Sequence, residues 1–149
     1  MRGQMLIYSF EKASSSASPV QPKLIRLLYN SACVILTADL FIFYTGSRLL
    51  FPEQEEIRSS AALRFFLRCA ANTSFPFALC SWLLRDYHIR HTHVGRVVGS
   101  CFALSHAASV ALYSWSRWVG GEYQLANFWG IVGLHGTWAG IALWGLLSA

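Results

Sequence analysis

Charged side chains are scarce in this chain. Only 13% of its 149 residues are Asp, Glu, Lys or Arg, whereas soluble domains usually hold about 25%. Hydrophobic residues make up 54% of the chain and aromatic residues 15%. A composition this apolar argues against an ordinary water-soluble domain and predicts a membrane protein that crosses the bilayer several times.

Motifs for several common chemistries are also missing. The sequence holds no glycine-rich nucleotide loop, no GxSxG and no HExxH, which argues against ATP-driven transport and standard hydrolase chemistry. No CxxC pair occurs, and the cysteines are expected to be free thiols within apolar segments: Cys33, Cys69, Cys80 and Cys101. The net charge of +5 comes from scattered basic residues, which predicts contact with lipid headgroups and no binding of nucleic acid.

Four apolar segments account for most of the chain. Each holds about 20 residues, which at about 1.5 Å per residue is enough to cross a hydrocarbon core of about 30 Å. The stretch 1–22 is expected to be a disordered tail, and 23–149 a single transmembrane domain. The expected spans are 24–44, 61–84, 94–116 and 126–147. The predicted fold is therefore an all-α, polytopic four-helix transmembrane bundle with both termini on one side, and the placement of Lys and Arg favours the cytoplasmic side.

The third apolar segment carries a ladder of small residues. They recur at every fourth position: Gly95, Gly99, Ala103, Ala107 and Ala111. On an α-helix this spacing forms one shallow groove, into which the glycine-rich fourth segment is expected to pack. The face from Gly95 to Ala111 is also a candidate surface for a homo-oligomer or for partner enzymes in the membrane.

Each expected span carries a polar side chain near its middle, namely Asp39, Asn72, His106 and His135. Such groups are costly to expose to lipid, so they are expected to turn toward a shared interior. There the two histidines would act as acid and base, Asp39 would orient an imidazole, and Asn72 would donate a hydrogen bond to a substrate oxygen. Two alternatives stay open: the four groups bond one another across helix interfaces, or the two histidines hold a haem iron. No cofactor is expected under the leading interpretation.

Two further clusters lie near the expected membrane surface. Arg64 and Arg68 predict an anion clamp for a substrate carboxylate or phosphate, or alternatively arginines neutralised by lipid phosphate and nearby glutamates. The turn RDYHIRHTH holds His88, His91 and His93, which predicts a pH-sensitive segment, with a zinc site as the alternative. Histidine-rich boxes do not recur, so a di-iron site is not expected, and no metal site is assigned.

Two stretches, ALRFFLRCAANTSFPFALCSW and GRVVGSCFALSHAASVALYSWSRW, resemble the second and third helices of small four-span membrane families. One is the scaffold family of sterol biosynthesis, whose third helix has a similar apolar run with a central histidine, at the position of His106 here. The other is the DoxX-like group of four-helix proteins. The resemblance implies a helper or catalyst for lipophilic small molecules at an intracellular membrane, such as the endoplasmic reticulum.

The leading functional expectation is a small integral membrane protein that binds a lipophilic metabolite among its helices. It is expected to catalyse proton transfer, such as isomerisation or cyclisation in lipid, terpenoid or secondary-metabolite biosynthesis. The alternative is a non-catalytic scaffold that tethers biosynthetic enzymes. A cavity lined by Asp39, His106 and His135 would favour the first function, and a filled interior the second.

Overall fold

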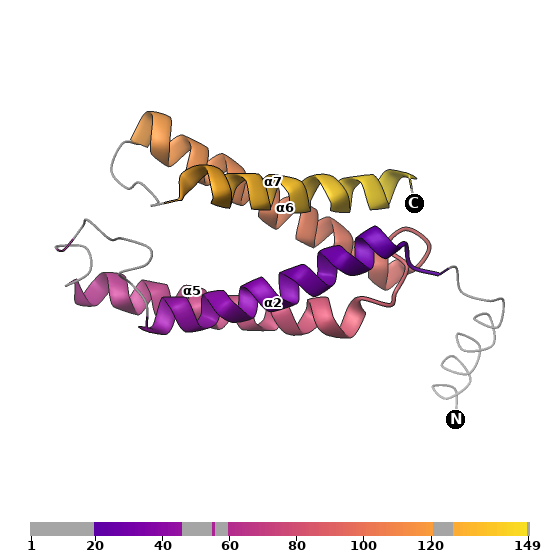
Figure 1. Cartoon of the computed structure of the whole chain (residues 1–149), viewed down its shortest axis with the longest axis horizontal. Coiled ribbons are helices and arrows are strands. Elements are labelled where there is room, and N and C mark those ends of the chain that lie inside the picture. Colours follow the sequence, from indigo (N-terminus) through magenta and orange to yellow (C-terminus); the bar gives the residue numbers. More distant parts are fainter. Residues whose placement is uncertain (1–19, 46–54, 56–59, 121–126, 149) are drawn as a thin grey trace, which may run out of the picture.

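The computed structural model describes residues 20–45, 55, 60–120 and 127–148. These parts form four long helices: α2 (Lys23–Thr45), α5 (Ala61–Leu84), α6 (His93–Trp115) and α7 (Phe128–Ser148). A short π-helix, η1 (Ser116–Gly120), continues α6 (Figure 1). No strand occurs in these described parts, so the predicted all-α class is confirmed.

The helices begin and end within two residues of the expected spans. Side chains just before the helix cap the N-termini of α5 and α6. The Ser60 hydroxyl accepts a hydrogen bond from the Leu63 N–H before α5, and the Thr92 hydroxyl accepts one from the Gly95 N–H before α6. These caps satisfy backbone donors that the first turn of a helix leaves without a partner. Helix α5 runs on through Pro76, which contributes no N–H to it.

The helices are arranged as two antiparallel pairs. Helix α2 packs along α5 and α6 packs along α7, while fewer contacts join α2 to α7. Figure 1 shows the two pairs close together where α2 begins and α7 ends, and further apart toward the other end. We call the first of these the closed end.

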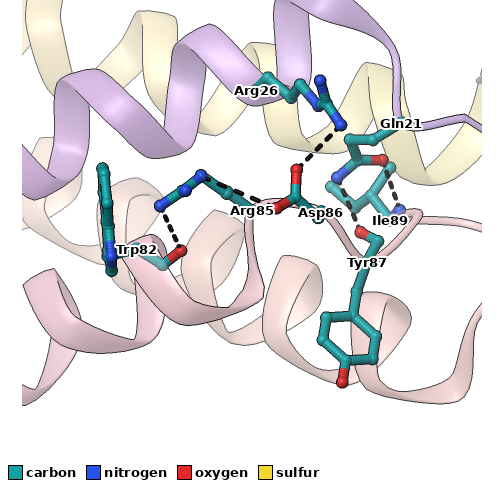
Figure 2. Close-up of polar contacts among 7 residues, drawn as sticks. All are labelled: Gln21, Arg26, Trp82, Arg85, Asp86, Tyr87 and Ile89. Atoms are coloured by element: carbon teal, nitrogen blue, oxygen red, sulfur yellow. Dashed lines mark hydrogen bonds and ion pairs between the residues drawn. The ribbon is translucent and has the colours of Figure 1, made fainter.

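The closed end is held by the turn between α5 and α6 (Figure 2). The Gln21 side chain donates to the Tyr87 carbonyl at 2.8 Å and accepts from the Ile89 N–H at 2.9 Å. Arg26 forms an ion pair with Asp86, with 2.9 Å between Nη2 and Oδ1. The start of α2 is therefore fastened to the turn by the buried side chain of Gln21, just before the helix, and by the exposed ion pair of Arg26, in its first turn.

The core lies mainly between α2, α6 and α7. It is built from large side chains set beside very small ones, together with Ile89 from the turn: Ile25, Leu28, Tyr29, Ala32, Ile89, Phe102, Ala103, Trp138 and Ala142. Many large apolar side chains stay outside it, including Phe66 on α5, Leu104 on α6 and Trp129 on α7. An exterior this apolar suits lipid better than water.

Three helices are long and apolar enough to cross a membrane, and they span Lys23–Thr45, His93–Val119 and Phe128–Ser148. Helix α5 has comparable length, but Arg64, Arg68 and Asn72 make it less apolar. Of the predicted tail, residues 1–19 lie outside the described residues. Gln21, which the prediction also placed in the tail, is buried at the closed end.

The small-residue ladder of α6 packs against the α5–α6 turn in addition to the expected α7. A Cβ atom on Gly95 would collide with the backbone carbonyl of His88, and one on Gly99 would lie 2.6 Å from Ile89 Cγ1. The α5–α6 turn therefore fills this part of the groove, and Leu146 of α7 reaches it as well, with 3.3 Å between its Cδ2 and a Cβ at Gly99. Helix α7 packs along α6, as predicted. Of the ladder, only Ala107 and Ala111 are exposed, which corrects the extent of the predicted interaction face.

Candidate functional site

The central feature of the site is a direct contact between two histidines. His106 on α6 and His135 on α7 approach each other with 2.7 Å between their Nδ1 atoms. The two residues are 29 positions apart in the sequence, and the pairing of α6 with α7 brings them to the same depth. The side chain of His106 is 6% exposed, so this contact lies inside the protein.

Aromatic rings hold the histidine pair in place. The ring of His106 lies 4.3 Å from that of Phe102 and 4.8 Å from that of Trp138, and the ring of His135 lies 5.6 Å from that of Tyr113. Trp138 is itself fixed, because its indole N–H donates to the Ser31 hydroxyl of α2 at 3.1 Å. These edge-on contacts restrict the rotation of both imidazoles.

The protonation of the pair follows from its geometry. A hydrogen bond between two Nδ1 atoms needs one ring to donate and the other to accept. When both rings are neutral, the donor ring has a bare Nε2 and the acceptor ring carries its proton on Nε2. The pair therefore offers one basic and one acidic nitrogen, and it favours at most one positive charge because a second proton would remove the acceptor.

The histidine pair lines a cavity of about 240 Å³ to which all four helices contribute. Asp39 of α2 lines the same cavity, as do hydroxyl groups of α5 and α6. The polar lining residues are Asp39, Thr73, Ser74, Ser105, His106, Ser109, Tyr113 and His135. The cavity therefore brings together the three residues that the sequence suggested as a catalytic set.

Asp39 is placed differently from the expectation in one respect. Within the described parts of the chain, its carboxyl makes no hydrogen bond or ion pair with His106 or His135. Asp39 and Tyr113 both line the cavity, from α2 and α6. Asp39 is thus a group of the cavity wall, and a ligand could reach it without breaking a bond to an imidazole.

Sequence reasoning missed the hydroxyl groups of the cavity. Thr73 and Ser74 both donate to the Ala70 carbonyl of their own helix, and Ser109 donates to the carbonyl of Ser105. Their hydrogens are used within the helix, which leaves their oxygens free to accept a bond from a ligand. One signal was available on α6, since Ser109 and Tyr113 follow His106 at helical spacing on one face.

The remaining predicted site residues lie away from this cavity. The Tyr44 hydroxyl donates to Asn72 Oδ1 at 2.8 Å, and the Arg68 guanidinium lies 5.9 Å from the Tyr44 ring centroid. Arg64 lies in the first turn of α5. None of Asn72, Arg64 and Arg68 lines the cavity that holds the histidine pair. The structure therefore does not bring these residues to the candidate catalytic set.

Among the histidines of RDYHIRHTH, His88 has a structural role. His88 is buried, and its Nδ1 accepts from the backbone N–H groups of Arg90 and His91 at 3.3 and 3.4 Å. Burial lowers the pKa of the His88 imidazole, and the neighbouring charges of His91 and Arg90 lower it further. Among the described residues, no group of three or more His, Cys, Asp or Glu side chains is placed to hold a metal ion.

In this geometry the Nδ1 atoms of His106 and His135 bond each other, so these two atoms are not placed as axial ligands of one haem iron. Comparison of the chain with protein-family profiles, with curated proteins and with solved structures gives no match.

Proposed function

We propose that this chain is a four-span membrane protein that binds a lipophilic small molecule in the histidine cavity and transfers a proton on it. The observation that carries the proposal is the bond between Nδ1 of His106 and Nδ1 of His135, within a cavity lined by four helices. Two imidazoles in direct contact form an acid and base pair without any cofactor.

The proposed chemistry is an isomerisation in which one proton leaves the substrate and another is returned. The bare Nε2 of the donor ring removes a proton from the substrate, and the Nδ1 proton of this ring passes to the other imidazole. That imidazole then releases its Nε2 proton to a second position on the substrate. The pair is neutral before and after the step, which suits a site that is poorly solvated.

The other cavity groups would bind the substrate. The carboxyl of Asp39 would accept a hydrogen bond from a substrate hydroxyl, or stabilise positive charge that develops during the transfer. The hydroxyl oxygens of Ser105 and Ser109 offer further acceptors on α6. Asn72 and the arginines have no direct part in this proposal, because they do not line the cavity.

Membrane insertion through four spans supports the choice of a lipophilic substrate. Three helices meet the requirements of length and apolarity, and α5 is paired with α2 along its length, so we propose that α5 crosses with it. A cavity between such helices is reached most readily from the lipid. Residence in the endoplasmic reticulum or another endomembrane is proposed with this function, on the resemblance to the sterol scaffold family.

The test begins with the small molecules that copurify with the intact protein, identified by mass spectrometry. These molecules are then incubated with delipidated protein in D₂O. The wild type is expected to introduce deuterium into them, and His106→Asn and His135→Asn are each expected to lower the rate by about 10²- to 10⁴-fold. His93→Asn is the matched control, since His93 is exposed at the start of α6. Equal deuterium uptake by wild type and both cavity variants would reject the proposal.

The scaffold alternative keeps one observation in its favour. A Cβ atom on Gly133 or Gly140 would meet nothing within 4 Å, so part of α7 is open to a partner helix. Under this alternative, Gly140→Leu would break complexes that are captured from native membranes, and His106→Asn would leave them intact.

A further inference from the structure

A second cavity lies between α5 and α6. It has a volume of about 200 Å³, and its accessible lining is apolar. Pro76, Phe77 and Cys80 form one wall, while Val97, Val98 and Cys101 form the other. We call this the α5–α6 groove. The hydroxyl of Ser81, which also borders the groove, donates to the Phe77 carbonyl and so presents no free hydrogen.

The α5–α6 groove lies beside the histidine cavity. Phe77 lines both spaces, and Phe102 lines the groove while its ring packs against His106 at 4.3 Å. The two helices that border the groove pack mainly on other partners, α5 on α2 and α6 on α7. Helices α5 and α6 therefore pack loosely against each other, and the space between them is polar near the histidines and apolar along the groove.

The sizes of the two spaces indicate a single ligand that occupies both. Pockets for small molecules usually measure about 300–1,000 Å³, and neither the histidine cavity nor the groove reaches this range alone. A ligand that occupied both spaces, which share Phe77 as a lining residue, would fill a volume within this range. The division into a polar and an apolar part matches a molecule with a hydrogen-bonding head and a hydrocarbon tail.

We propose that the ligand is a single-chain amphiphile, with a hydroxyl or carbonyl head at His106 and His135 and its hydrocarbon chain in the α5–α6 groove. The inference rests on the proposed function, because the head occupies the same cavity. It adds the class of ligand and the path of the chain. Cys80 and Cys101 are exposed on opposite walls of the groove, so the chain can enter sideways from the lipid.

The experiment uses the full chain in lipid nanodiscs with two photoactivatable probes. One is 1-hexadecanol with a diazirine in mid-chain, and the other is 1-hexanol with a terminal diazirine. Cross-linked positions are mapped by mass spectrometry, with and without excess unlabelled alcohol. The hexadecanol probe is expected to label residues 76–80 and 97–101, and excess unlabelled alcohol is expected to reduce this labelling. The hexanol probe is expected to label the cavity around His106.

Two variants separate the groove from the head site. Cys101→Trp fills the groove and is expected to reduce the competed labelling by hexadecanol at least fivefold, while labelling by hexanol persists. Leu112→Trp is the matched control, because Leu112 is exposed on α6 and lines neither space. His106→Leu is expected to reduce competed labelling by both probes.

Each outcome decides one of the two proposals. One outcome is that the hexanol probe labels the cavity while the hexadecanol probe labels all exposed apolar faces evenly. This would reject the groove as the site of the hydrocarbon chain and would leave the proposed function unaffected. The same applies if Cys101→Trp and Leu112→Trp behave alike. If neither probe labels the cavity in a competed manner, or if His106→Leu changes nothing, the proposed function falls and the inference falls with it.

Discussion

At the scale of single residues, close packing decides which glycines matter. Gly95 and Gly99 are buried against the α5–α6 turn, whereas Gly133 and Gly140 of α7 have open space where a side chain would stand. Sequence alone gives these four residues the same apparent role, that of small residues in an apolar helix. Replacement by alanine should therefore destabilise the protein at Gly95 and Gly99, and should be neutral or stabilising at Gly133 and Gly140.

We expect Gly95→Ala to destabilise the protein by about 1–3 kcal/mol, because the added methyl group must displace the backbone carbonyl of His88. Gly140→Ala should be neutral or should stabilise α7 by about 0.5–1 kcal/mol, since alanine costs less backbone entropy in a helix. Thermal unfolding in detergent micelles measures both changes. Similar losses for the two variants would show that the contact at Gly95 is not the cause.

The buried imidazole of His88 should make stability depend on pH. Its pKa is lowered in the folded state by burial and by the nearby charges of His91 and Arg90, so the unfolded chain binds more protons as the pH falls. The stabilisation from neutral His88 is complete above its unfolded pKa of about 6.5 and is lost as the pH falls below it.

We therefore expect the midpoint of thermal unfolding to fall between pH 7.5 and pH 5.5, and to fall less in His88→Asn. The asparagine side chain can still accept from the backbone N–H groups of Arg90 and His91 but does not titrate. His93→Asn serves as the control because His93 is exposed. A pH dependence that is unchanged in His88→Asn would contradict this account.

At the scale of helices and turns, the α5–α6 turn joins the two helix pairs. Ile89 is fully buried beside Gly99 and Gly145, and Gln21 bonds the backbone on both sides of His88. The exposed ion pair between Arg26 and Asp86 spans the same junction. Buried hydrogen bonds are costly to leave unmade, while exposed ion pairs contribute little.

Gln21→Leu should therefore cost about 1–3 kcal/mol of stability, because it leaves the Tyr87 carbonyl and the Ile89 N–H without their partner. Arg26→Gln should cost about 0–1 kcal/mol, since both ends of the ion pair are largely solvated. Thermal or denaturant unfolding ranks the two variants. The opposite ranking would mean that the exposed ion pair, and not the buried glutamine, fastens the junction.

At the scale of the whole molecule, the number of membrane crossings depends on α5. Four antiparallel helices bring the start of α2 and the end of α7 to the closed end (Figure 1). If α5 crosses with α2, the start of α2 and the end of α7 lie on one side of the membrane. If α5 lay outside the membrane, the three remaining spans would place these two helix ends on opposite sides.

We expect Val20→Cys and Ser148→Cys, each made in a chain whose native cysteines are replaced by alanine, to react with a membrane-impermeant maleimide from the same side of sealed vesicles. Trp118→Cys should react only from the other side, because it follows α6 at the opposite end of the bundle. Labelling of Val20→Cys and Ser148→Cys from opposite sides would show an odd number of crossings and would exclude the four-span arrangement.

The sequence by itself determined the helical class and the approximate ends of the helices. Apolar runs of about 20 residues, bounded by capping residues such as Ser60 and Thr92, are local features, so they can be read without knowing what packs against them. The mid-depth positions of Asp39, His106 and His135 follow from the same counting. Their catalytic roles stay a prediction.

Only the tertiary structure decided which of these groups meet. The angular position of a side chain around a helix matters only relative to its neighbours, so counting depth could not separate His135, which contacts His106, from Asn72, which bonds Tyr44. The filling of the α6 groove by Ile89 depended likewise on the fold of a turn. Depth is a property of one helix, whereas contact and cavity are properties of several helices packed together.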